Sequence, residues 1–94
     1  MWTLDKALPL IKKISDAARS CGFSVALYGS VLEQGKSSKD LDLFFVEQDP
    51  GRDVELCRNE IKKLPEVRRF GHCAIWLVDG RHIDAQFLLD CKRD

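Results

Sequence analysis

Residues 40–46 constrain the fold most, because apolar side chains occupy every second position along this stretch. The three alternate apolar residues are Leu41, Leu43 and Phe45. Side chains alternate between the two faces of a β-strand, so these three can be buried together while Asp40 and Asp42 lie side by side on the opposite face. Two neighbouring carboxylates repel each other unless a cation lies between them, and hard oxygen ligands of this kind suit Mg2+ or Mn2+. The stretch therefore predicts a half-buried strand that carries a candidate metal site.

Two further strand-like runs, residues 74–78 and 81–88, are joined at Asp79-Gly80. An Asp-Gly pair between such runs is a strong signal for a two-residue β-hairpin turn. Asp84 lies inside the second run, on the face opposite to that of its apolar neighbours. A charged residue in mid-strand needs a partner, and a metal shared with the two earlier aspartates is one. The hairpin is thus expected to bring a third carboxylate to the site.

Residues 23–28 are apolar and rich in strand-forming types, and the run stops at Gly29-Ser30. A glycine has no side chain, so the backbone turns tightly there and approaches a ligand closely. Ser30 adds a hydroxyl and an N–H group. A short helix over residues 31–33 would direct its free N–H groups and the positive end of its dipole to the same place. The segment therefore predicts a binding site for an anion such as a triphosphate.

The helical spacing of apolar residues predicts one helix over residues 4–21 and a second over residues 49–64. Thr3 or Asp5 is expected to cap the first of them. Trp76 alternates with apolar neighbours, so we expect it to pack in the core or at its rim rather than to stack on a base. The predicted order is helix, strand, short helix, strand, helix, strand, strand. This order indicates a two-layer α+β domain in which helices cover one face of a mixed four-stranded sheet and the other face remains open.

In this arrangement of motifs the chain resembles the nucleotidyltransferase superfamily that includes the DNA polymerase β palm, in its minimal single-domain form. The family pattern is an apolar residue, Gly, and Gly or Ser, then a spacer of roughly nine to thirteen residues, then Asp, apolar, Asp or Glu, apolar. A third acidic residue follows on a later strand. The positions that fill the pattern in order are Tyr28, Gly29, Ser30, Asp40, Leu41, Asp42, Leu43 and Asp84.

The resemblance implies a catalytic site with two divalent ions, Mg2+ or Mn2+. Asp40 and Asp42 would bind both ions, and Asp84 would complete the site of the ion that activates the acceptor hydroxyl. Gly29 and Ser30 would hold the triphosphate of a nucleoside triphosphate, with ATP as the expected one. The implied reaction moves a nucleoside monophosphate to a hydroxyl group of a protein, an RNA or a small molecule.

The chain departs from the family at residues 32–35, which read Leu-Glu-Gln-Gly where many minimal members carry Ala-Arg-Gly just after the Gly-Ser pair. Glu33 replaces the usual basic residue, and Lys36 or Lys39 in the following loop would then supply positive charge to the phosphates. The departure leaves two alternatives. One is a module without activity that binds a partner protein, as small members do with helical toxin partners. The other is a regulatory domain that binds a nucleotide without transfer.

The composition fits this interpretation. A length of 94 residues suits one domain spanning residues 1–94 with one core. Fifteen basic residues balance fifteen acidic ones, which argues against strong binding to nucleic acid. No apolar run reaches the roughly eighteen residues needed to span a membrane, so we expect a cytoplasmic protein. The larger family members bind base and acceptor with an added helical domain, so here a partner protein, self-association or the acceptor itself is expected to supply those contacts.

The four cysteines are widely spaced and contain no Cys-x-x-Cys pair; they are Cys21, Cys57, Cys73 and Cys91. We expect reduced thiols, most of them buried. His72, Cys73 and His82 are expected to be ordinary hairpin residues rather than zinc ligands. The basic pairs at residues 62–63 and 68–69 are expected to form a solvated face at a helix end.

Overall fold

The strand that the alternating aspartates predict lies inside a mixed sheet. The computed structural model describes residues 2–28, 36–37, 41–49 and 51–88. Within these residues, strand β4 (Leu41–Glu47) pairs antiparallel with β2 (Phe23–Tyr28) and parallel with β7 (His82–Leu88). β6 (Ala74–Leu77) follows β7 in the sheet and β5 (Val67–Phe70) forms its edge, which gives the order β2-β4-β7-β6-β5. The predicted β6–β7 hairpin is confirmed, since these strands pair antiparallel. The prediction of a two-residue turn was wrong, because residues 78–81 lie between the end of β6 at Leu77 and the start of β7 at His82.

The sheet has five strands in the described residues, so the prediction of four strands was wrong. The extra strand is β5, whose basic pair Arg68-Arg69 was expected at a helix end. Val67 and Phe70 are both buried although they are three positions apart, because the register between β5 and β6 shifts between Val67 and Arg69. Such a bulge adds a residue to one strand and breaks the period of two. The alternation that identifies a strand in a sequence is therefore missing from β5.

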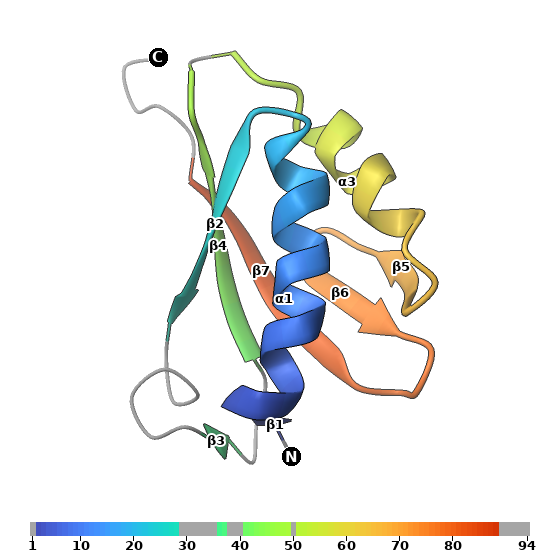
Figure 1. Cartoon of the computed structure of the whole chain (residues 1–94). Helices are drawn as coiled ribbons and strands as arrows, with labels where there is room; N and C mark the ends of the chain where they lie inside the picture. The colour runs from blue at the N-terminus through green and yellow to red at the C-terminus, as the bar shows by residue number, and fades with distance from the viewer. Residues whose placement is uncertain (1, 29–35, 38–40, 50, 89–94) are drawn as a thin grey trace.

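A second, two-stranded sheet pairs β1 (Trp2–Thr3) with β3 (Lys36–Ser37). Lys36, which was expected in a loop, lies in β3 opposite Thr3. Figure 1 shows this small sheet at the end of the molecule where β4 begins. The predicted short helix over residues 31–33 falls outside the described residues.

Helix α1 (Leu4–Arg19) begins where the sequence predicts, and the Thr3 hydroxyl caps it by accepting a bond from the Lys6 N–H at 3.3 Å. Helix α3 (Val54–Lys62) begins later than residue 49. The Asp53 carboxylate is its cap, because Oδ1 accepts from the N–H groups of Glu55 and Leu56 at 2.9 and 3.2 Å. Gly51, with a φ of +84°, has a left-handed backbone that an α-helix does not include. The second helix is thus confirmed with a corrected start.

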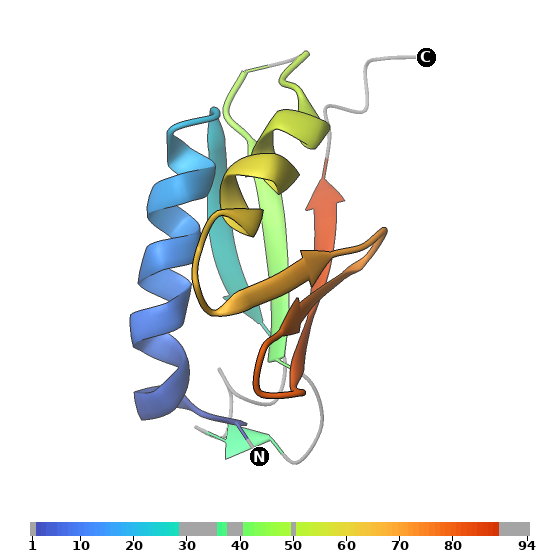
Figure 2. The ribbon, with the colours of Figure 1, turned by 90° about the vertical axis from the view of Figure 1, so that its right-hand side faces the viewer.

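Both helices pack on the same face of the sheet, where α1 contacts β2, α3 contacts β5 and the two helices contact each other. Helix α1 lies in front of the sheet in Figure 1 and beside it in Figure 2. The buried residues under them are Ala7, Leu10, Ile14, Ala18, Cys21, Phe23, Leu41, Leu43, Phe45, Cys57, Ile61, Val67, Phe70, Ile75, Leu77, Ile83 and Ala85. Phe45 lies at the centre of an aromatic group, with its ring centroid 4.9 Å from that of Phe87 and 5.9 Å from that of Phe70. The Arg58 guanidinium lies over both of these partner rings. The molecule is therefore a two-layer α+β domain, as the sequence predicts at this coarser level.

No helix in the described part of the chain is long and apolar enough to cross a membrane.

Candidate functional site

The parallel pairing of β4 with β7 sets Asp42 directly opposite Asp84. Leu41 and Leu43 on one strand and Ile83 on the other are fully buried under the helices, so the aspartates between them point to the opposite face. Neighbouring strands in a sheet lie about 4.8 Å apart, which makes the two aspartates immediate lateral neighbours. The side chain of Asp84 keeps 47% of its surface exposed. Two of the three predicted carboxylates are therefore brought together at one half-exposed position.

Two residues on the neighbouring strands flank this aspartate pair along the same row of the sheet. Ala74 on β6 lies opposite Asp84, and Tyr28 on β2 lies opposite Asp42. The alanine has only a methyl group, so it leaves space beside the Asp84 carboxylate. β2 ends at Tyr28, and Gly29 and the rest of the predicted phosphate segment follow it in the chain. The run from β2 into this segment therefore starts in the row that holds the carboxylates.

Several predicted site residues lie outside the described residues: Gly29, Ser30, Lys39 and Asp40. Lys36 is described as part of β3 by its backbone. The structure therefore says where Asp42 and Asp84 lie and leaves the phosphate segment and the first aspartate as predictions from the sequence.

A row of three side chains that the sequence analysis did not assign to the site runs across the same face of the sheet, the open face, on which neither of the described helices α1 and α3 packs. Trp76 pairs with His82 across β6 and β7, and Arg69 pairs with Trp76 across β5 and β6. The ring centroids of Trp76 and His82 lie 4.6 Å apart, and the Arg69 guanidinium carbon lies 5.2 Å from the centre of the Trp76 ring system. His82 Nε2 lies 3.5 Å from Asp84 Oδ1. An unbroken series of contacts thus reaches from the edge strand β5 to one of the carboxylates.

Part of this row could have been found in the sequence. His82 and Asp84 are two positions apart in a predicted strand, which places them on one face. The pairing of Trp76 with His82 depends on the hairpin register, and the position of Arg69 depends on the β5 bulge. Neither can be read from residue spacing alone.

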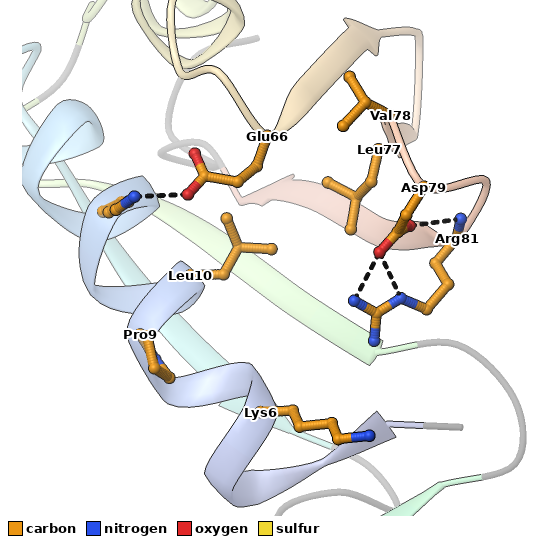
Figure 3. A pocket seen from close by; sticks show the side chains of 9 residues that line it. Lys6, Pro9, Leu10, Glu66, Leu77, Val78, Asp79 and Arg81 are labelled. Carbon is orange, nitrogen blue, oxygen red and sulfur yellow. Dashed lines mark hydrogen bonds and ion pairs between the residues drawn. The ribbon is translucent and has the colours of Figure 1, made fainter.

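On the helix-covered side, a cavity of about 240 Å³ lies between α1 and the β6–β7 hairpin (Figure 3). Its charged lining consists of Lys6, Lys13, Glu66, Asp79 and Arg81. Lys13 forms an ion pair with Glu66, and the Arg81 guanidinium donates to Asp79 at 2.7 and 3.0 Å. These bonds hold the pKa of both carboxyl groups below the usual range. Four of the five charged residues in the lining are therefore already paired with each other, and the lining does not include the aspartates of the open face.

The donor chemistry of the aspartate pair fits a hard divalent ion, because carboxylate oxygens are the ligands that Mg2+ and Mn2+ prefer. Among the described residues, no group of three His, Cys, Asp or Glu side chains could hold a metal. The third carboxylate of the predicted metal site belongs to Asp40, which lies outside the described residues. His82 contacts Trp76 and Asp84, while His72 and Cys73 are exposed in the β5–β6 turn. The open face therefore offers oxygen ligands, with one imidazole beside them.

The chain matches no protein-family model and no curated protein sequence. On the open face, a carboxylate pair lies beside an ordered row of aromatic and basic groups.

Proposed function

We propose that this protein is a metal-dependent nucleotidyltransferase that moves a nucleoside monophosphate from a nucleoside triphosphate, with ATP as the expected donor, to a hydroxyl group of an acceptor. The observation that carries the proposal is the pairing of Asp42 with Asp84 on the uncovered face of adjacent parallel strands. The resemblance of the Gly-Ser and Asp-Leu-Asp-Leu motifs to the nucleotidyltransferase superfamily supports it. A pair of adjacent like charges is unfavourable in the absence of a cation, which is the physical reason to expect an ion there.

In this proposal the residues bind and orient the reactants. Asp42 and Asp84, together with Asp40, hold Mg2+ or Mn2+, and Gly29 with Ser30 binds the triphosphate. When bound, the divalent ions make the acceptor hydroxyl easier to deprotonate and neutralise charge on the leaving pyrophosphate. The acceptor hydroxyl loses its proton to solvent and its oxygen forms a bond to the α-phosphorus. The bond from that phosphorus to the bridging oxygen breaks, and pyrophosphate leaves. The side chains of Lys36 and Lys39 would offset the negative charge of the phosphates in place of the family's arginine.

A second candidate function is a module that binds a partner protein. Val46 and Leu88 are paired in register on β4 and β7, and both side chains are exposed, at 39% and 43%. Adjacent exposed apolar side chains on an open sheet face favour contact with another protein. Such binding would persist after divalent ions are removed, whereas nucleotide transfer would stop.

The proposal is tested with ATP labelled at the α-phosphate, Mg2+ and a cell extract that supplies acceptors. We expect label to enter one or more acceptors with the wild-type protein, and to be lost with EDTA and with Asp42→Asn or Asp84→Asn, by at least about 100-fold. Asp16→Asn is the matched control, because Asp16 is an exposed carboxylate on α1 that pairs with Lys12. It should transfer label like the wild type.

The fold of the two test variants is checked by urea unfolding without metal. Each substitution removes repulsion between neighbouring carboxylates, so the free energy of unfolding should stay the same or rise. Normal transfer by a folded Asp42→Asn protein would contradict the proposal. The second candidate, a module that binds a partner protein, would be favoured by two results together: no protein or RNA in the extract acquires label, and a protein from the extract stays bound to the chain in EDTA.

A further inference from the structure

His82 is held from one side by its neighbour on the next strand. Its ring lies 4.6 Å from Trp76, measured between centroids, with an angle of 32° between the ring planes. Trp76 in turn carries the Arg69 guanidinium at 5.2 Å, so cation–π attraction adds to the packing of the row. The His82 side chain is only 30% exposed. The imidazole therefore has a defined orientation before any ligand binds.

That orientation directs one nitrogen of the imidazole to a carboxylate. His82 Nε2 lies 3.5 Å from Asp84 Oδ1. This distance is that of an ion-pair contact and is longer than an ordinary N–H···O hydrogen bond. Contacts of this kind in catalytic sites are often long in the free state and shorten when the site is filled. An N–H group that donates to a carboxylate oxygen restricts rotation of that carboxylate.

We infer that His82 is a positioning residue for the metal site, which orients Asp84 through Nε2–H and is itself held by Trp76 and Arg69. The inference rests on the proposed function, because it concerns the same carboxylate. Groups that hydrogen-bond to metal ligands orient those ligands, and their loss commonly weakens metal binding by about 10- to 100-fold. This row gives the protein an ordered support for Asp84 that comes from three strands.

The inference is tested by titrating the full chain with Mn2+ alone at pH 7.5 and measuring free Mn2+ by electron paramagnetic resonance. His82→Phe keeps an aromatic ring against Trp76 and removes the N–H donor, so the Kd for Mn2+ should rise about 10- to 100-fold. His82→Gln keeps an N–H donor and removes the ring, so its Kd should lie much closer to that of the wild type. His72→Phe changes the other histidine, which is exposed in the β5–β6 turn, and serves as the matched control.

Each outcome has a defined meaning when urea unfolding shows that the variants are folded. Weak binding by His82→Phe with recovery in His82→Gln supports the inference. Wild-type affinity in His82→Phe, or equally weak binding by the Phe and Gln variants, overturns the role of the N–H donor while the metal site stands. If Asp84→Asn binds Mn2+ as tightly as the wild type, the proposed metal site is wrong, and the inference about His82 is wrong with it.

Discussion

On the face of β4 that meets the helices, Leu41, Leu43 and Phe45 are fully buried, whereas Asp42 and Phe44 on the other face remain partly exposed. The same contrast holds on β7, where buried apolar residues alternate with His82, Asp84 and Gln86 on the open side. Buried and exposed residues thus alternate along each strand and do not form separate segments of the chain.

The two faces contribute to stability in opposite ways. Burial of apolar area on the covered face supplies the main driving force for folding. The open face holds adjacent like charges, which oppose folding in the absence of a cation. A sheet that keeps such charges on one face can do so because the other face provides enough stabilisation.

The largest expected loss of stability comes from a substitution on the covered face. Phe45→Ala removes a fully buried ring that packs on Phe70 and Phe87, so the free energy of unfolding should fall by about 3–5 kcal/mol. Phe44→Ala changes the next residue, which points to the open face, and should cost roughly 1 kcal/mol. Urea unfolding monitored by circular dichroism measures both. Equal losses for the two variants would show that the faces do not differ in this way.

A smaller effect on the free energy of unfolding is expected from pH, through a thiol buried on the covered side. Burial, with a further contribution from the Cys21 thiol, raises the pKa of the Cys57 thiol on α3 from 9.0 to about 12. The folded thiol stays protonated where the unfolded thiol has ionised, so its contribution to stability is complete below pH 9.0 and is lost as pH rises toward about 12. The loss should approach about 1.4 kcal/mol per pH unit in this range.

The measurement is the free energy of unfolding of the wild type and of Cys57→Val between pH 8 and the highest pH at which the protein stays folded. The slope with pH should be shallower in Cys57→Val. Cys73→Val is the control, because Cys73 is exposed and should leave the slope unchanged. Identical slopes for the wild type and Cys57→Val would contradict the assignment of the slope to this thiol.

The sequence predicts those elements whose pattern is local. Alternation identifies β4 and β7, and an apolar run of strand-forming residues identifies β2. The Asp-Gly turn identifies the β6–β7 hairpin. β5 is not predicted because its bulge separates Val67 from Phe70 and disrupts the alternation. The start of the second helix is misplaced because its cap, Asp53, follows a glycine with a left-handed backbone.

For the candidate site, spacing predicts the face on which Asp42 and Asp84 lie, but the contact between their strands depends on the parallel register of β4 and β7. The row that supports Asp84 depends on two further registers, one across the hairpin and one past the bulge. Long-range pairing of this kind is set by packing of the whole sheet and not by neighbours in the sequence.

We propose that the open face, and not the cavity between α1 and the β6–β7 hairpin, binds a metal nucleotide. The most direct test is an NMR titration of the labelled protein with Mn2+ and the nonhydrolysable analogue α,β-methylene ATP. Paramagnetic broadening should appear first at the amides of Asp42 and Asp84 and be absent from their signals when Mg2+ replaces Mn2+. Broadening that begins instead at Lys13 and Glu66, which line the cavity, would contradict the account, as would spectra that do not change at millimolar ligand.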